Sequence, residues 1–348
     1  YGTAMKNSEL SSAEKQKEDI KASNETPGFV DAGTSYYNTD GTESSRYSTV
    51  QSGLRRGIDC IGDAHKLLGV RLSPVNNIDT YVPGNICDVF ALGKFTIGIA
   101  AVRGLAHQDH TELRQDSVAF AVTTNERYLI ASVADGVSAA KWGHLGAELA
   151  SKTAVAHVRR MLNSGTYLED IVWEEVTGVI RESLRTRGKA AFRIDSSDTE
   201  EIDRQLAKLI GTTTEVIVAD CGDSDQPASF VRASLSGDGY MFWLQDGKFS
   251  TKINRDSRDP FLVSHRVNPL PLSPGVEYPI VENGELLNND AVVLTTDGIG
   301  NDIYANEEVA EYLAKHLKEP LPAHELLRIS SYLCNHCFDD RSIIILWA

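Results

Sequence analysis

The sequence is poor in several features that would each indicate a particular class of protein. Five cysteines in 348 residues are too few for a disulfide framework in a chain of this size. Acidic residues outnumber basic ones by 49 to 34, and the net charge of -15 argues against nucleic acid or an anionic membrane as a partner. No apolar run approaches the roughly 18 residues that a membrane span needs, and the N-terminus has no apolar signal core. We therefore expect a soluble protein of the reducing cytoplasm.

One pair of cysteines has the spacing of a zinc or redox pair. It occurs in Cys334-Asn335-His336-Cys337. The chain has no second CxxC, and the surrounding pattern is that of the end of a helix. We interpret this pair as ordinary packing.

The composition divides the chain into three parts. Residues 1–52 are rich in Ser, Thr, Asn, Gly, Glu and Lys, and such a segment buries too little apolar surface to offset its ordering entropy, so it reads as a flexible tail or linker. Residues 53–93 form an N-terminal extension of unassigned role. Together these first 93 residues could be a tail, a partner-docking segment or an extra edge of the domain. Residues 94–348 are expected to form the folded domain.

Within residues 94–348, apolar strands occur in groups with pairs of helices between them. The helical patterns cover roughly residues 147–161, 168–184 and, in two segments, 306–335. The expected strands are 95–102, 117–123, 128–134, 212–221, 229–235, 240–245, 291–296 and 342–347. Short separations between neighbouring strands favour antiparallel pairing. The pattern predicts two antiparallel sheets faced by helices.

Aspartates stand at the ends of four of these strands. Asp135 and Asp297 each follow a strand and precede a glycine, whereas Asp116 and Asp339-Asp340 each precede a strand. If the strand ends meet at one edge, the carboxylates repel one another unless a cation neutralises them. Mg²⁺ and Mn²⁺ prefer oxygen ligands of this kind. A single Asp-Gly pair, such as Asp246-Gly247, is better explained as a turn, so only the set indicates a metal site.

The set stands in an order that resembles the metal-dependent serine/threonine protein phosphatases of type 2C, in a divergent bacterial branch. The resemblance covers about residues 94–348, and each motif is weak by itself. The matching motifs are RQDS (Arg114 to Ser117), VADGVSAAKWGHLGAELAS (Val133 to Ser151), GTTT (Gly211 to Thr214), SGDGY (Ser236 to Tyr240), LTTDGIGND (Leu294 to Asp302) and FDDRSIIIL (Phe338 to Leu346). The fold that this implies is an α+β fold, an αββα sandwich of two antiparallel sheets flanked by helices on both faces.

The resemblance also implies roles for individual residues. Asp135 would bridge two metal ions, Mn²⁺ or Mg²⁺, and the Gly136 carbonyl would bind one of them. Asp297 and Asp339 would complete the coordination of the other ion, and Asp116 would hold metal-bound water in the outer shell. The ions would activate a water that attacks phosphorus in line, without a phosphoenzyme.

The sequence departs from the family at several positions. Gln115 stands where most members have glutamate, and Asp340 takes the place of the usual asparagine. The phosphate-binding arginine has no clear counterpart: His107 occupies roughly its place, either on the substrate side or as a packing histidine, and Arg103 or Arg114 could substitute. Two further carboxylates, Asp238 and Asp302, are candidates for a third ion.

Two functions follow from these motifs. The first is a metal-dependent hydrolase that removes phosphate from phosphoserine and phosphothreonine in proteins, with a serine/threonine kinase or its targets among the substrates. The second is a catalytically weak or inactive relative that serves as a regulatory or scaffolding module. The three aspartates Asp135, Asp297 and Asp339 favour the first; Gln115 and the missing arginine keep the second open.

Overall fold

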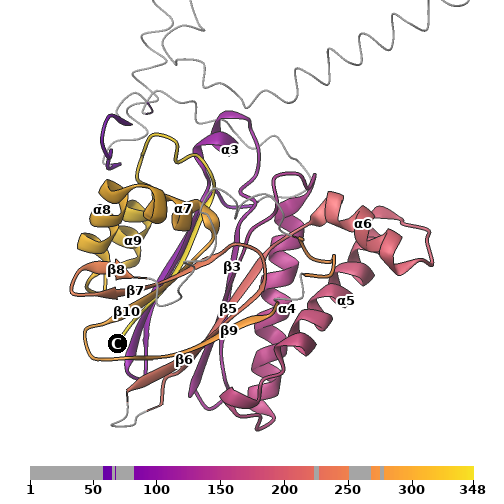
Figure 1. Ribbon diagram of the computed structural model, residues 1–348, viewed down its shortest axis with the longest axis horizontal. Helices are drawn as coiled ribbons and strands as arrows, with labels where there is room; N and C mark the ends of the chain where they lie inside the picture. Colours follow the sequence, from indigo (N-terminus) through magenta and orange to yellow (C-terminus); the bar gives the residue numbers. More distant parts are fainter. Residues whose placement is uncertain (1–57, 65–66, 68–81, 223–226, 251–267, 275–277) are drawn as a thin grey trace, which may run out of the picture.

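The computed structural model describes residues 58–64, 67, 82–222, 227–250, 268–274 and 278–348. These residues form two antiparallel sheets that pack face to face, with helices on both outer sides (Figure 1). The αββα sandwich expected from the sequence is confirmed. The tail expected over residues 1–52 lies outside the described residues. Within the described ranges, no helix combines the length and the apolar character that crossing a membrane requires.

The first sheet has the strand order β1-β2-β11-β10-β7-β8. Its two central strands, β10 and β11, carry the apolar runs AVVLT and RSIIILW. The strands are β1 (Asn85–Leu92), β2 (Phe95–Val102), β7 (Tyr240–Gln245), β8 (Lys248–Ser250), β10 (Ala291–Thr295) and β11 (Arg341–Trp347). Three helices cover its outer face: α7 (Asp297–Ala305), α8 (Glu307–Leu317) and α9 (Ala323–Ser330).

The second sheet has the order β3-β4-β5-β6-β9. Its strands are β3 (Ser117–Val122), β4 (Tyr128–Ala134), β5 (Thr214–Asp220), β6 (Ala228–Ser236) and β9 (Ile280–Leu286). The long helices α4 (Gly143–Asn163) and α5 (Trp173–Phe192) cover its outer face together with α6 (Thr199–Ile210). A short helix, α3 (Leu105–Asp109), connects β2 to β3 at one end of the sandwich.

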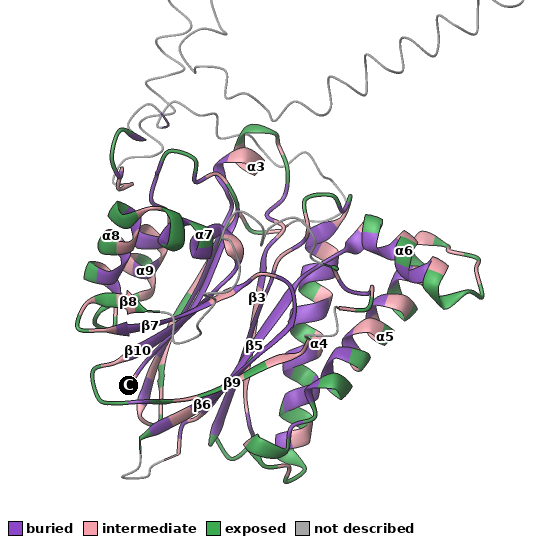
Figure 2. Cartoon of the chain, in the orientation of Figure 1, coloured by how far each residue is buried: buried purple, intermediate pink, exposed green. Residues whose placement is uncertain are grey.

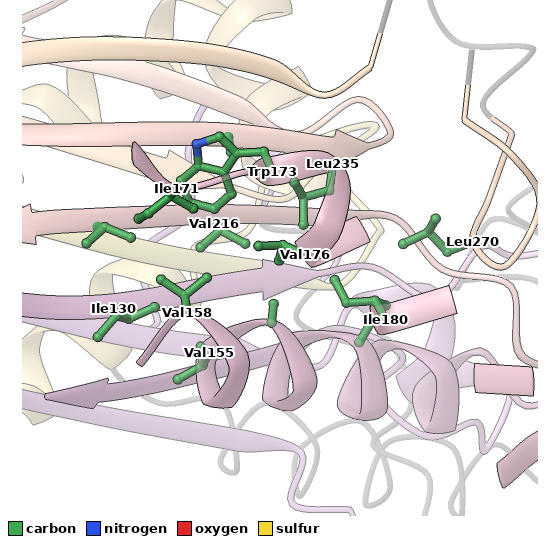
Figure 3. Packing of buried hydrophobic residues seen from close by; sticks show 14 of the residues in the cluster. Ile130, Val155, Val158, Ile171, Trp173, Val176, Ile180, Val216, Leu235 and Leu270 are labelled. Carbon is green, nitrogen blue, oxygen red and sulfur yellow. The ribbon is translucent and has the colours of Figure 1, made fainter. Parts of the chain in front are cut away.

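The central strands are apolar on both faces because each face is covered. In β4, Leu129 and Ala131 point into the core between the sheets, whereas Ile130 points outward and packs under α4 and α5 (Figure 3). In β11, Ile344 joins the inner core and Ile343 the outer core under α7, α8 and α9. Figure 2 shows the result: the central strands are buried throughout, and the helices are exposed only on their outward sides. This burial explains why continuous apolar runs predicted these strands.

Several expected boundaries need correction. The β1 strand pairs along its whole length with β2, so the first sheet begins before residue 94, inside the expected N-terminal extension. The second long helix begins at Trp173 rather than near residue 168, where Leu168–Asp170 forms only a 3-10 turn. The last helix ends at Ser330 rather than near residue 335. The sequence analysis did not predict β1, β9, α3, α6 or α7.

The CxxC pair lies beyond this last helix. Cys334 and Cys337 are reduced thiols in the turn after α9, and both are buried in the outer core of the first sheet. Each Sγ donates to the carbonyl of Asn335, at 3.4 and 3.5 Å. The pair therefore packs as part of the core.

Candidate metal centre

The strand pairing brings the aspartates to one edge of the sandwich. Ser117 pairs with Ala134, so Asp116 and Asp135 leave the β3-β4 hairpin at the same end. Thr295 pairs with Ile343, so the residues after β10 and before β11, including Asp297 and Asp339, also share an end. A hydrogen bond joins the two sheets at this edge, from Thr296 Oγ1 to Asp116 Oδ2 at 2.7 Å.

Asp135 occupies the middle of the resulting cluster. Its carboxyl lies within hydrogen-bonding reach of the carboxyls of both Asp116 and Asp297. Asp116 is 3% exposed, Asp135 and Asp297 are half-buried, and Asp339 is exposed. The cluster is therefore closed on the side of Asp116 and open to the surface at Asp339.

Burial and mutual repulsion raise the pKa of each carboxyl in this group. For Asp116, burial is the largest cause and the charge of Asp340 the next, and together they raise the pKa to about 7. Burial, followed by the charges of neighbouring aspartates, raises the pKa of Asp135 and Asp297 well above the ordinary value. Asp339 is exposed as a whole residue, but its carboxyl is surrounded by protein atoms, and this desolvation together with the charge of Asp340 raises its pKa as well. Carboxyls under such repulsion bind either protons or a cation.

Asp340 differs from its neighbours because it is the acceptor of a local network. It is 1% exposed, and its carboxylate accepts hydrogen bonds from the backbone N–H groups of Gly104, at 2.6 Å, and Gln115. His107 Nδ1 lies 2.9 Å from Asp340 Oδ1. Burial alone would raise the pKa of Asp340, but His107 and the two backbone donors outweigh it and lower that pKa. Asp340 is thus an ionised anchor that joins the segments before β3 and β11.

The contact with Asp340 also determines the protonation state of His107. Burial lowers the pKa of this histidine, but the Asp340 carboxylate outweighs burial and raises the pKa to about 9. His107 is therefore cationic at neutral pH, and its Nε2 also lies 3.5 Å from Glu112. His107 lies on α3, beside the cluster, and faces Asp340. Its side chain is 13% exposed.

Glycines allow the backbone segments of the site to approach closely. A Cβ on Gly298 would lie 1.9 Å from the carbonyl oxygen of Asp340, and one on Gly136 would lie 2.4 Å from the backbone of Gly143. Neither position accepts a side chain. The peptide that follows Asp135 is held further by two donors to the Asp135 carbonyl, Thr212 Oγ1 and Thr213 N, each at 2.8 Å. The Asp135-Gly136 turn is therefore rigid.

The two arginines considered as phosphate ligands are engaged elsewhere. Arg114 is buried, and its guanidinium donates to the carbonyls of Pro83 and Asp116. Arg103 is also buried and donates to the carbonyl of His107. Asp302 accepts from the Tyr332 hydroxyl at 2.5 Å and pairs with Arg341, so it belongs to a buried network behind the site.

The donor set fits hard divalent cations. Four carboxyls that raise one another's pKa converge on one edge, and carboxyl oxygens are the donors that Mg²⁺ and Mn²⁺ prefer. Gln115 Oε1 is buried at this edge and has no hydrogen-bond partner among the described residues. No group of three or more His, Cys, Asp or Glu side chains in the described part of the chain is arranged as a formed metal site. The residue types present at this edge therefore fit the ions, although the side chains are not arranged around a common ion position.

Sequence reasoning named both His107 and Asp340 but missed that they pair. The sequence did contain a signal for this pair, because Asp340 and His107 both depart from the family pattern, one as an added acid and the other as an added base. It also missed Thr296, which orients Asp116. A hydroxyl residue directly before Asp297 gave no distinguishing signal.

No curated protein matches this sequence. The S. agalactiae serine/threonine phosphatase is 14% identical in sequence, the match covers 73% of this chain and 99% of that chain, and the TM-score is 0.43. Mycobacterium tuberculosis PstP/Ppp is 16% identical, the match covers 72% of this chain and 97% of that chain, and the TM-score is 0.43. PppA, a regulatory component of T6SS in Pseudomonas aeruginosa, is 16% identical. That match covers 75% of this chain and 100% of that chain, and the TM-score is 0.42.

A family model gives the decisive match. Residues 103–328 match the model described as Protein phosphatase 2C. This range contains Asp116, Asp135 and Asp297 and ends before Asp339. Because the match spans well over half of the 348 residues, the chain belongs to the protein phosphatase 2C family.

Proposed function

We propose that this protein is a metal-dependent phosphomonoester hydrolase that removes phosphate from phosphoserine and phosphothreonine side chains of proteins. The observation that carries the proposal is the cluster of Asp116, Asp135, Asp297 and Asp339 at one edge of a protein phosphatase 2C fold. The opening at Asp339 supports access for a phosphate group carried on another protein.

The residues have distinct roles in this proposal. Asp135, in the middle of the cluster, and the Gly136 carbonyl would hold the ions, Mn²⁺ or Mg²⁺. Asp297 and Asp339 would be further ligands, and Asp116 would support the site from the outer shell. When bound, the ions supply charge stabilisation to the phosphoryl group and a water of lowered pKa.

The rest of the site keeps these ligands in place. Thr296 donates to Asp116, and Thr212 and Thr213 hold the peptide of Asp135. Asp340 ties the segments that carry Asp116 and Asp339 to each other through backbone donors. His107 acts through Asp340 as a positioning residue, because its Nδ1 faces that carboxylate.

The cysteines support hydrolysis without a thiol nucleophile. Burial raises the pKa of all five, to about 11 for Cys221. A thiolate is the nucleophilic form of cysteine, and it is disfavoured at each of these positions. The cysteines therefore do not favour a thiol nucleophile, in agreement with the proposed attack by water.

A second candidate function is a catalytically weak regulatory module. It is favoured by Arg114, whose guanidinium is committed to backbone carbonyls, and by the neutral Gln115 in the place of the family's glutamate. Hydrolysis of para-nitrophenyl phosphate with Mn²⁺ and with EDTA separates the two. Turnover that requires Mn²⁺, followed by preference for phosphoserine and phosphothreonine peptides over phosphotyrosine peptides, supports the phosphatase; absence of turnover with bound Mn²⁺ supports the module.

A further inference from the structure

The loop between β6 and β7, residues 237–239, reaches the same edge as the carboxylate cluster. Tyr240, the first residue of β7, pairs with Thr295, the last residue of β10. Asp238 therefore leaves the sheet two residues before this pair, and Asp297 leaves it two residues after, at the same end. The Tyr240 hydroxyl donates to Asn301 Oδ1 at 2.8 Å, and Asn301 Nδ2 lies 3.4 Å from Asp297 Oδ2, so loop and cluster are physically linked.

Side chains hold the carbonyl on either side of Asp238. The Tyr278 hydroxyl donates to the carbonyl of Gly237 at 2.6 Å. Arg232 Nη2 donates to the carbonyl of Gly239 at 3.0 Å. These two contacts hold the backbone directly before the half-buried Asp238 and the peptide that follows Gly239.

Arg232 is itself held by a buried ionic network. It is 1% exposed and pairs with Glu215 and Glu282, at 2.8 Å in each case. Ser234 donates to the second oxygen of Glu215 at 2.6 Å. A buried pair of this kind is weak evidence for stability, because desolvation offsets most of the attraction. The third partner of Arg232, the Gly239 carbonyl, is the one that lies in the loop.

The loop also packs against the residue that holds Asp135. Gly237 has φ +114°, a conformation that L side chains rarely adopt, and a Cβ there would lie 2.4 Å from Thr213 Cβ. Thr213 N donates to the Asp135 carbonyl. The loop is therefore seated on the support of the central carboxylate as well as beside Asp297.

We propose that Arg232 and Tyr278 are positioning residues: they hold Asp238 at the edge of the cluster, where its charge strengthens cation binding next to Asp297. The inference rests on the proposed metal centre. In this inference, Arg232 and Tyr278 affect ion affinity only indirectly, because both contact the backbone of the loop that carries Asp238. The competing explanation is that the network serves only to hold β6 between β5 and β9.

The test is a double-mutant cycle on Mn²⁺ affinity, measured by calorimetric titration of the full-length chain. Replacing Arg232 would leave Glu215 buried without its partner, so the cycle uses Tyr278→Phe and Asp238→Asn. We expect Asp238→Asn to weaken Mn²⁺ binding by about tenfold and Tyr278→Phe to weaken it by a smaller factor. If Tyr278 acts through Asp238, the double variant binds no more weakly than Asp238→Asn alone.

The matched control is Tyr312→Phe. This hydroxyl donates to Asp59 from α8, on the outer side of the first sheet, and its loss should leave Mn²⁺ affinity unchanged. Unchanged affinity in Tyr278→Phe, or two effects that simply multiply in the double variant, overturns the inference while the metal centre stands. A wild-type protein that binds no Mn²⁺ overturns the metal centre, and the inference with it.

Discussion

His107 Nδ1 lies 2.9 Å from Oδ1 of Asp340, and this contact joins α3 to the segment that carries Asp339. Asp340 is buried and also accepts hydrogen bonds from the backbone N–H groups of Gly104, Gln115 and Asp116. A buried carboxylate of this kind is stable only while its partners remain. The pair therefore links an acid at the usual asparagine position to a base at the usual arginine position.

Breaking the pair from one side should be costly. We expect His107→Gln to lower the free energy of unfolding by about 3 kcal/mol, because it leaves Asp340 buried without its cation. Adding Asp340→Asn to the same chain should recover most of that loss. Urea unfolding of the two single variants and the double variant measures the coupling. Losses that add in the double variant would show that the contact is incidental.

The pH dependence of stability follows from the raised carboxyl pKa values. A carboxyl whose pKa is raised in the folded state contributes stability that is present below its unfolded pKa and is lost as the pH rises through the folded pKa. For Asp116, that window runs from about 4 to about 7. His107 acts in the same direction at higher pH, because its contribution is lost between about 6.5 and about 9.

We therefore expect the metal-free protein to melt at a lower temperature at pH 8 than at pH 5.5. Saturating Mn²⁺ should remove this decline, because the cation replaces the protons that the cluster releases. Thermal melts in EDTA and in Mn²⁺ across this range check both statements. A metal-free melting temperature that rises steadily to pH 8 would mean that the carboxyls do not repel one another as described.

Metal binding should also stabilise the fold at constant pH. If Mn²⁺ binds only the native state, a hundredfold excess over its dissociation constant adds about 2.7 kcal/mol to the free energy of unfolding. The melting temperature should rise with Mn²⁺ and return to its starting value with EDTA. A melting curve that does not change up to millimolar Mn²⁺ would count against a carboxylate metal centre.

Removal of residues 1–50 should leave the domain intact. This segment has few large apolar residues, and we expect its deletion to leave folding and the Mn²⁺-dependent hydrolysis of a small substrate largely unchanged. Expression yield, melting temperature and turnover of the truncated chain make the comparison. Loss of soluble protein would show that the segment packs into the domain.

The strands that the sequence predicted best are those buried on both faces. The residues of β2, β4 and β7 were predicted to the residue because their apolar runs are continuous. By contrast, β9 alternates exposed and half-buried positions at the edge of its sheet, and its sequence IVENGEL carries few apolar residues. An edge strand is paired on one side only, so its composition gives little local signal.

For the site, the sequence indicated the aspartates but not what holds them. Asp135 and Asp297 follow apolar strands directly, and that pattern is local. The contacts of Asp340 with Gly104 and Gln115 join residues far apart in the chain, and only the folded backbone brings them together. Arg232 and Glu215 did carry a signal, because each is a charged residue within a predicted strand, and such a pair is worth seeking in sequences of this kind.

The most direct test of the metal centre is the replacement of its central carboxylate. Asp135→Asn keeps the size of the side chain and removes the charge that the ions would share, and an amide is a much poorer ligand for hard cations. The matched control is Asp246→Asn, at an exposed position of the β7-β8 turn with φ +50°, a conformation that asparagine tolerates.

Turnover of para-nitrophenyl phosphate and Mn²⁺ affinity should be measured for both variants and the wild type over one Mn²⁺ titration. The account predicts that Asp135→Asn remains folded, binds Mn²⁺ more weakly and loses at least about a hundredfold in turnover, on the order of 3 kcal/mol of barrier, while Asp246→Asn matches the wild type. An Asp135→Asn variant with wild-type turnover and wild-type Mn²⁺ affinity would contradict it.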